Sequence, residues 1–214
     1  SNLKFIGCSS STLPLTAQTQ FINKYKIKVA NLYGLSESGP SHIDYPLKKN
    51  WKPGSIGVPL DVNRCKIDKN GEILLKGDNI FLNYYKNTSL YKEVVKKGWF
   101  HTGDLGKFKK NKFWFVDRKK DLIIKGGINI VPMEIEEIIY KNKNVEECVV
   151  VGKFDKIQGE NVVAVIKKKN NIKIHNDAIA KQIISDCKKK ISNYKIPSHI
   201  LFWEDIPKHL QKIY

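Results

Sequence analysis

Two neighbouring stretches of the sequence decide the fold: Gly98-Trp99-Phe100-His101-Thr102-Gly103-Asp104 and Asp117-Arg118-Lys119-Lys120-Asp121-Leu122-Ile123-Ile124-Lys125-Gly126-Gly127-Ile128-Asn129-Ile130-Val131-Pro132-Met133-Glu134-Ile135-Glu136. The first predicts a tight turn that presents a carboxylate, because glycine permits close backbone approach. The second holds an arginine, a charged segment, a glycine pair and a proline suited to the first turn of a helix. Together they gather several candidate functional residues into one short part of the chain.

The composition is typical of a protein with a packed core. The 214 residues, of which 41% are hydrophobic, suffice for one large domain or two small ones. Four cysteines lie far apart and form no Cys-x-x-Cys pair, so reduced thiols are expected rather than a zinc or disulfide framework. We see no signal peptide and no apolar run near about 18 residues. These features predict a cytoplasmic protein without a transmembrane segment.

The net charge of +17 is unevenly distributed. Residues 1–120 carry +13 and residues 121–214 carry +4, and the only arginines are Arg64 and Arg118. A positive first part would attract polyanions such as ATP, CoA or an acidic carrier protein. A basic module that binds nucleic acid is the alternative, but no aromatic residues interleave with a lysine stripe, which disfavours it.

The first part of the chain predicts an α/β layer. A short apolar run at residues 3–6, an amphipathic stretch over Leu15–Tyr25 and a second run over Lys28–Asn31 read as strand, helix and parallel strand. Ligands of such sheets bind where strands end in loops. The loop predicted from Tyr33 to Gly39 is therefore a candidate site.

The rest of the chain predicts a β-rich section and then an α+β unit. In the β-rich section, hairpins are expected around Asp68–Gly71 and around residues 109–112, and a helix over Thr88–Lys96. In the α+β unit, a hairpin around Gly126-Gly127 precedes a helix that starts at Pro132. We expect two helices over a three-stranded sheet, with strands at residues 148–151, 162–166 and 200–203 and the second helix at residues 177–191.

Two side chains stand out by their chemistry. A carboxylate such as Asp104 can accept hydrogen bonds from both hydroxyls of a ribose, although a turn aspartate can also simply stabilise its own loop. Arg118 is an arginine in a chain that otherwise uses lysine, and its planar fork cannot be replaced by lysine. It reads either as a ligand-binding arginine or as an ordinary surface charge.

Several blocks together resemble one family. Tyr33-Gly34-Leu35-Ser36-Glu37 is similar to a tyrosine-glycine-x-threonine-glutamate motif, with serine in place of threonine. With the Thr-Gly-Asp, Asp-Arg-Lys-Lys-Asp and Gly-Gly blocks, and with Pro207-Lys208 and Lys212 near the end, this pattern resembles the adenylate-forming superfamily of acyl-CoA synthetases. The resemblance covers nearly the whole chain.

The resemblance implies two domains. Residues 1–119 would be the C-terminal part of the large AMP-binding domain, with a sheet-loop-helix portion and a small β-barrel-like subdomain. Residues 120–214 would be the small mobile α+β domain, with the hinge at Lys120. The fold class expected is thus α/β followed by α+β.

The resemblance also assigns roles to residues. Tyr33 would stack on adenine with Gly34 beside it, Ser36 would contact the α-phosphate, and Glu37 would hold Mg²⁺, which prefers oxygen ligands. Asp104 and Arg118 would bind the ribose and phosphate of ATP or AMP. Gly126 and Gly127 would let the pantetheine arm of CoA pass close to the backbone, unless they merely form a hairpin turn. Lys212, or failing that Lys208, would neutralise carboxylate and α-phosphate during adenylation.

The resemblance finally implies a reaction. A carboxylic acid, with a fatty acid as the first expectation, would be activated by ATP as acyl-AMP and transferred to CoA. The family's phosphate loop is absent from this sequence, so we expect the chain to be a fragment that is inactive by itself. A ligase that loads an acyl-carrier protein is the alternative within the family.

Overall fold

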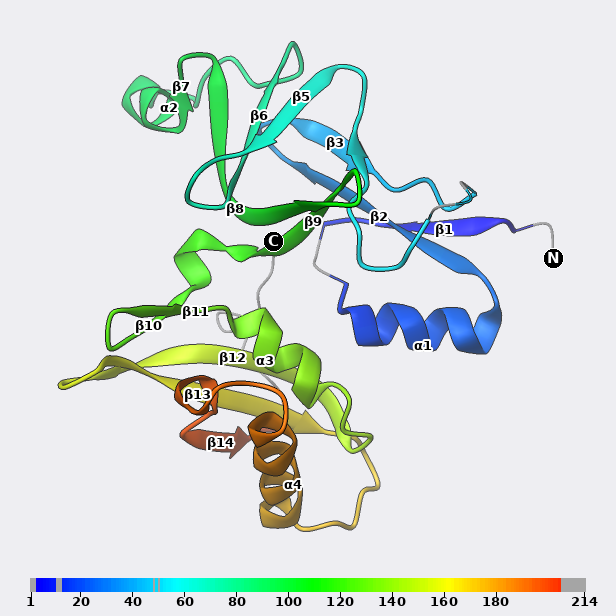
Figure 1. Cartoon of the computed structure of the whole chain (residues 1–214), viewed down its shortest axis with the longest axis vertical. Coiled ribbons are helices and arrows are strands. Elements are labelled where there is room, and N and C mark those ends of the chain that lie inside the picture. Colours follow the sequence, from blue (N-terminus) through cyan, green and yellow to red (C-terminus); the bar gives the residue numbers. More distant parts are fainter. Residues whose placement is uncertain (1–2, 11–12, 48, 50, 205–214) are drawn as a thin grey trace. The chain divides into compact units, whose positions relative to one another are not determined.

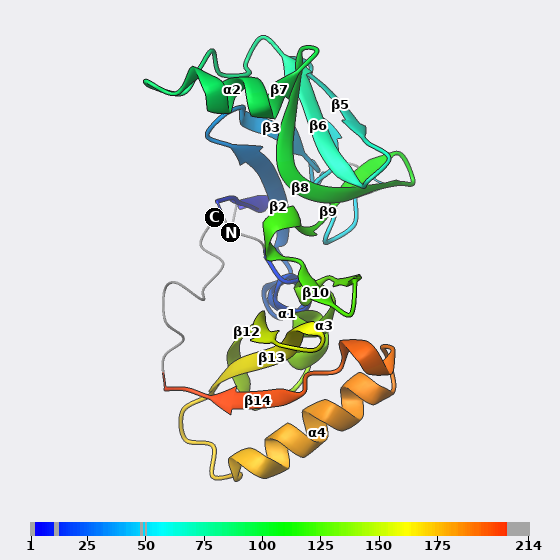
Figure 2. The same ribbon diagram turned by 90° about the vertical axis from the view of Figure 1, so that its left-hand side faces the viewer.

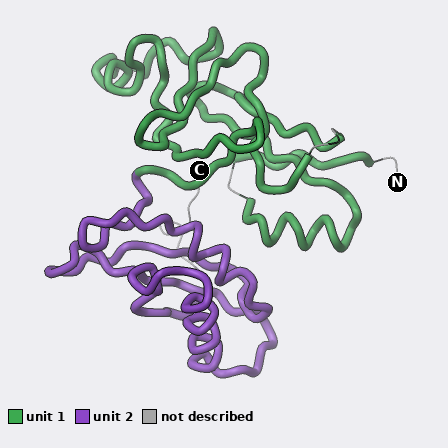
Figure 3. Tube along the Cα trace, viewed as in Figure 1, with its two compact units in different colours: residues 1–119 green, residues 120–214 purple. Residues whose placement is uncertain are grey.

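The computed structural model describes residues 3–10, 13–47, 49 and 51–204, and it divides into two compact units. Unit 1 comprises residues 1–119 and unit 2 comprises residues 120–214 (Figure 3). A short 3₁₀ turn at Lys119–Asp121 spans the boundary in sequence. No helix in the described ranges is both long enough and apolar enough to cross a membrane.

Unit 1 begins with the predicted strand–helix–strand pattern. Strands β1 and β2 pair in parallel, and α1 connects them (Figure 1). Gln18 of α1 is buried, donates to Val29 O at 2.7 Å and accepts from Gly54 N at 2.7 Å, so it joins the helix to β2 and to the following segment. The sheet has the order β1-β2-β3-β4. Its elements are β1 (Phe5–Cys8), α1 (Leu15–Tyr25), β2 (Lys28–Leu35), β3 (Gly39–Ile43) and β4 (Val58–Pro59).

One expectation for this sheet was wrong. The segment from Tyr33 to Gly39 is not a loop throughout, because β2 continues to Leu35 and β3 already begins at Gly39. Only the three residues between them form the turn. The segment is rich in polar residues and glycine, which is typical of loops, and the antiparallel pairing of β2 with β3 was therefore not predicted.

The second sheet of unit 1 is built from antiparallel hairpins, as predicted. Strands β5 and β6 pair across the Asp68–Gly71 turn, where only Gly71 has a positive φ, and β8 pairs with β9. The predicted helix at residues 88–96 is shorter and ends at Val94, and Val95 and Lys96 form a strand instead. The core contains Ile73, Leu75, Phe100 and Phe113. The elements are β5 (Asn63–Ile67), β6 (Glu72–Gly77), α2 (Thr88–Val94), β7 (Val95–Lys96), β8 (Trp99–Lys109) and β9 (Lys112–Arg118).

Unit 2 is an α+β unit whose sheet has five strands rather than the expected three. The order is β11-β10-β13-β12, with β14 also paired to β13. The Gly126-Gly127 hairpin supplies the two additional strands, because Lys125 bridges to Gly159 of β13. The elements are β10 (Ile123–Lys125), β11 (Ile128–Ile130), α3 (Pro132–Ile139), β12 (Val145–Asp155), β13 (Gly159–Lys168), α4 (Asn176–Lys188) and β14 (His199–Phe202).

The core of unit 2 lies between this sheet and its two helices (Figures 1 and 2). Alternate residues of β12 and β13 point to the helices, as the period of a strand requires. Pro132 occupies the first turn of α3, as predicted. The cluster joins isoleucines of both helices to β12 and β13: Ile135, Ile138, Ile139, Ile179, Ile183, Cys148, Val150, Val162, Ala164 and Ile166.

A buried ion pair in unit 1 supports a stability prediction. Lys112 Nζ contacts Asp44 Oδ1 at 2.8 Å and Oδ2 at 2.9 Å, and both side chains are less than one-tenth exposed. Asp44→Asn leaves the lysine charge buried without its counter-charge, so unit 1 should lose roughly 3–5 kcal/mol of unfolding free energy. Urea unfolding followed by tryptophan fluorescence measures the loss.

The control for this experiment is Asp61→Asn, at an exposed position. Asp44→Asn combined with Lys112→Met should lose less stability than Asp44→Asn alone, because the double variant buries no unpaired charge. Equal stability of Asp44→Asn and Asp61→Asn would show that the pair contributes nothing.

Candidate functional site

Asp104 lies inside strand β8, not in the tight turn expected from Thr-Gly-Asp. Glu72 pairs with Leu105 and Leu74 pairs with His101, so β8 contains two more residues than β6 over this interval. Gly103 takes φ of +74° in this bulge, a conformation that favours glycine. The bulge turns the strand locally and re-aims Asp104.

Glu72 holds the bulge in place. Its carboxylate accepts a hydrogen bond from Gly103 N at 2.9 Å, lies 3.3 Å from His101 Nδ1, and lies 3.9 Å from Lys119 Nζ. Glu72 is only 6% exposed. Sequence reasoning placed it in a strand and missed this role. The available signal was a carboxylate at the start of an otherwise apolar buried strand, since such a charge needs partners.

The Asp104 carboxylate brings three predicted residues together. It accepts a 2.8 Å hydrogen bond from Tyr33 Oη through Oδ2, and Arg118 Nε lies 3.4 Å from Oδ1. Asp104 and Arg118 face each other across β8 and β9. The side chain of Asp104 therefore reaches two other strands, β2 and β9. It is 3% exposed, so these partners compensate the cost of burying its charge.

The Tyr33 ring packs between aromatic neighbours. The His42 ring meets it edge-on at 5.4 Å between centroids, and the Phe115 ring lies 6.3 Å away. Burial raises the pKa of Tyr33 well above its usual value, and the nearby Asp104 charge raises it further. The hydroxyl therefore remains protonated and donates to Asp104 at neutral pH.

Gly34 and Ser36 lie in the β2–β3 hairpin. The register shifts between Tyr33 and Gly34, and a Cβ at Gly34 would overlap the carbonyl oxygen of Gly39. Only glycine permits this close approach of two backbones. Ser36 is exposed in the turn that follows.

Glu37 faces a pocket of about 510 Å³ in unit 1. Its Oε1 accepts a hydrogen bond from Tyr84 Oη at 2.9 Å, a contact that sequence reasoning missed. Burial, with the bond to Glu37, raises the pKa of Tyr84 to about 12, so this donor is protonated at neutral pH. Three carboxylates (Glu37, Glu72, Glu93) and three basic side chains (Lys96, His101, Lys119) line the pocket.

Glu37 is suited to hold one side of a magnesium ion. Among the described residues, no group of three or more His, Cys, Asp or Glu side chains could hold a metal by itself. Mg²⁺ is commonly bound through one or two carboxylates together with substrate phosphates. Tyr84 fixes one oxygen of Glu37, and in the described part of the chain Oε2 accepts no hydrogen bond, which fits a single metal-directed oxygen.

In unit 2, Gly126 and Gly127 form the tip of the β10–β11 hairpin. Their φ values are +57° and +78°, and a Cβ at either position would meet nothing within 4 Å. The turn geometry by itself accounts for the glycines. The tip also leaves bare, exposed backbone at the surface of the unit.

The remaining predicted positions are placed as follows. Lys120 is the first residue of unit 2, and it lies exposed in the 3₁₀ turn. Lys208 and Lys212 lie outside the described residues. Arg118 ends β9, two residues before Lys120.

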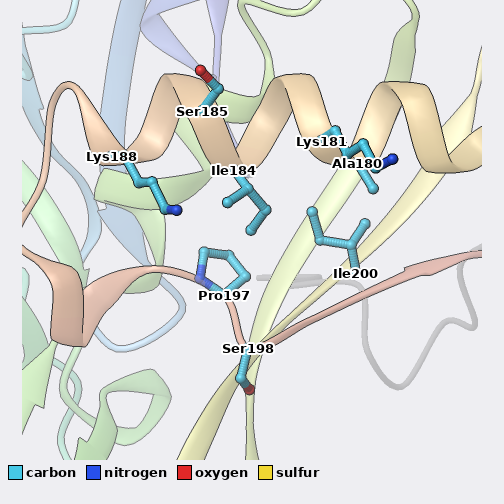
Figure 4. A pocket seen from close by; sticks show the side chains of 8 residues that line it. All are labelled: Ala180, Lys181, Ile184, Ser185, Lys188, Pro197, Ser198 and Ile200. Atoms are coloured by element: carbon cyan, nitrogen blue, oxygen red, sulfur yellow. The ribbon is translucent and has the colours of Figure 1, made fainter.

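Unit 2 contains a pocket that includes none of the predicted residues. It measures about 480 Å³ and lies where α4 meets the segment leading into β14 (Figure 4). Ile184, Pro197 and Ile200 provide apolar contacts, and the exposed Lys181 and Lys188 lie along the helix side.

Comparison with known proteins identifies relatives of both units. Residues 1–85 match the family described as AMP-binding enzyme, and residues 134–211 match the AMP-binding enzyme C-terminal domain. The chain is 33% identical over 221 residues to a long-chain-fatty-acid–CoA ligase of Bacillus subtilis, covering 97% of this chain and 39% of that protein.

Two solved structures are similar to the chain as well. The anthranilate CoA ligase AuaEII in complex with anthranoyl-AMP superposes with a TM-score of 0.86 at 25% identity, over 96% of this chain and 42% of that one. The o-succinylbenzoate CoA synthetase MenE of Bacillus subtilis, in complex with ATP and magnesium ion, gives a TM-score of 0.78 at 28% identity, over 94% and 43%.

These comparisons confirm the predicted fold class, since the mixed α/β and α+β arrangement recurs in the solved structures. The chain spans about two fifths of the length of the relatives that it matches. Both matched regions belong to one kind of protein, and they follow each other here in a single chain. The chain therefore belongs to the AMP-binding, adenylate-forming enzyme family.

Proposed function

We propose that the protein containing this chain is an AMP-forming acid–thiol ligase that uses ATP and CoA. The observation that carries the proposal is the convergence of Tyr33 and Arg118 on the buried Asp104 carboxylate, beside a pocket that Glu37 lines. The relatives named as CoA ligases support the same reaction class. The activity proposed is that of the whole protein, of which this chain supplies a part.

The first half-reaction joins a carboxylic acid to AMP. A carboxylate oxygen of the acid attacks the α-phosphorus of ATP, the bond to the β-phosphate oxygen breaks, and pyrophosphate leaves. Asp104 and Arg118 would hold the ribose and phosphate groups of ATP, and Ser36 would contact the α-phosphate. Glu37 would hold Mg²⁺, which neutralises phosphate charge when bound. Lys212 would reduce the repulsion between the two anions as they meet.

The second half-reaction transfers the acyl group to a thiol. The deprotonated thiol of CoA attacks the acyl carbonyl carbon, and AMP leaves with the bonding electron pair. We propose that unit 2 turns about Lys120 between the two steps, withdrawing Lys212 and presenting the Gly126-Gly127 tip. A hinge needs only a few residues that absorb a change in φ and ψ.

A fatty acid is the substrate class that we propose. The long-chain-fatty-acid–CoA ligase relative supports this choice, whereas the two structural relatives are named for aromatic acids. An acyl-carrier protein is the second candidate acceptor, because the charge of +13 on residues 1–120 suits an acidic partner. Thioester formation with CoA alone would exclude it.

Asp104→Ala should weaken nucleotide binding in both half-reactions of the intact enzyme. Each lost charge-assisted hydrogen bond costs about 1.5–3 kcal/mol, so the KM for ATP should rise about 10- to 150-fold. The KM for a supplied acyl-adenylate should rise similarly, because the ribose is present in both. Steady-state kinetics of each step, with the exposed Asp78→Ala as control, provides the measurement.

A structural role for Asp104 gives a different pattern. Unchanged KM values together with a lower unfolding midpoint would mean that Asp104 supports only the packing of β2, β8 and β9.

Substitutions at Lys212 and Gly126 should separate the two half-reactions. Lys212→Ala should slow acyl-adenylate formation about 10²- to 10³-fold and spare thiol transfer, because its charge acts only in the first step. Gly126→Asn should do the reverse. Asparagine followed by glycine suits this turn, so the hairpin should keep its shape while a side chain fills the thiol route. Both steps are assayed on each variant.

Lys120→Pro completes this set. Proline fixes φ near about −65°, so the variant should reduce complete turnover more than adenylation. If Lys212→Ala slowed both steps equally, or neither, Lys208 would take its place as the candidate. If Gly126→Asn left thiol transfer intact, the glycine pair would serve the turn alone.

A further inference from the structure

The Gly126-Gly127 hairpin is anchored at its base by Ile123 and Ile130 in the core of unit 2, but its strand pairing with the rest of the sheet is short. Between β10 and β13 the only paired residues are Lys125 and Gly159 among those described. Two further hydrogen bonds support the attachment: Gly126 N donates to Gln158 O at 2.7 Å, and Ile124 N donates to Glu160 Oε2 at 2.6 Å. Glu160 is thus a side chain that supplies a ladder bond normally made by a strand backbone.

The donor and acceptor of this bond come from different hairpins. Ile124 is 53% exposed on β10, while Glu160 is half-buried on β13. A hydrogen bond to an ionised carboxylate is about twice as strong as a neutral one. The bond from Ile124 N is therefore a strong restraint between the buried base of the hairpin and its exposed tip.

The chain makes room for the Glu160 side chain. A Cβ at Gly152, on the neighbouring strand β12, would overlap the Glu160 carboxylate. Gly152 has no unusual φ that would otherwise call for glycine. The absent side chain at this position leaves the carboxylate free to reach Ile124.

The β12–β13 turn contains Gln158, whose carbonyl oxygen accepts the hydrogen bond from Gly126 N. This turn is itself held by several hydrogen bonds. Asp155 Oδ1 accepts from Ile157 N at 2.9 Å and from Gln158 N at 2.8 Å, and Oδ2 accepts from Asn161 Nδ2 at 2.7 Å. The backbone donors lower the pKa of Asp155 below its usual value. Gln158 O, the acceptor for Gly126, therefore lies on an ordered turn.

We infer that Glu160 is a positioning residue for thiol transfer, because it fixes the glycine hairpin through the Ile124 amide. The inference rests on the proposed function, in which this hairpin borders the route of the thiol. Glu160 acts through the hairpin and not by contact with either substrate. Its loss should affect only the step in which the hairpin faces the active site.

The experiment uses the full-length enzyme with Glu160→Ala, Glu160→Gln and, as a matched control, Glu146→Ala. Glu146 is an exposed glutamate on the same pair of strands and lies 3.7 Å from Lys167. Adenylation is followed by pyrophosphate exchange, and transfer by the reaction of a supplied fatty acyl-adenylate with CoA. Hydrogen–deuterium exchange at the Ile124 and Gly126 amides is recorded on the same samples.

Glu160→Ala should slow transfer about 10- to 150-fold, the equivalent of one lost charge-assisted bond, and should leave adenylation unchanged. Exchange at Ile124 and Gly126 should accelerate, while the core amides of β13 remain protected. Glu160→Gln should recover most of the transfer rate, because its amide oxygen still accepts the Ile124 hydrogen bond. Glu146→Ala should match the unmodified enzyme in every assay.

Three results would overturn the inference. Faster exchange with normal transfer would make Glu160 a structural residue only. Unchanged exchange in Glu160→Ala would mean that the tether is absent in solution. Equal slowing of both steps would indicate general damage to unit 2. If the unmodified enzyme forms no acyl-adenylate, the proposed function fails together with the role of Glu160, and the exchange data then report the tether alone.

Discussion

The buried Asp104 carboxylate is the constraint on which the rest of unit 1 depends. A charge that is 3% exposed is tolerated only if its partners replace water, and here Tyr33 and Arg118 do so. Those partners come from β2 and β9, so one carboxylate joins both sheets of the unit. Its position depends in turn on the bulge that Glu72 holds open through Gly103 N. The stability of the unit and the geometry of its candidate site are therefore coupled.

Much of the fold could be predicted because its signals are local. The parallel β1–α1–β2 pattern, the hairpin at Gly71 and the start of α3 at Pro132 each follow from residues close together in sequence. The number of strands in the sheet of unit 2 was underestimated, because two of them join the sheet through a contact that is distant in sequence. Its hairpin joins through a bridge from Lys125 to Gly159, and no periodicity in the sequence reports such a contact.

The candidate site likewise contains some residues that could be predicted from the sequence and others that could not. Tyr33, Asp104 and Arg118 could be predicted from motif resemblance, and the structure brings them together. The roles of Tyr84 and Glu160 could not be predicted, because they depend on distant partners. Tyr84 bonds to Glu37, 47 positions away, and Glu160 bonds to Ile124, 36 positions away. Their side chains satisfy buried or edge polar groups, a requirement that arises only once the strands are placed. Asp104 was predicted in a turn because the glycine that creates its bulge is equally typical of turns.

The bulge in β8 also limits how this segment can change in length. Phe100 lies in the core, and a Cβ at Gly106 would point at Ile73 of the same core, so both ends of the interval face inward. They do so because the bulge adds two residues, an even number that preserves the alternation of a strand. Loss of a single residue between them would turn one half of β8 inside out, whereas loss of a pair would keep both halves in phase. A change in length here is therefore tolerated better in steps of two residues than in steps of one.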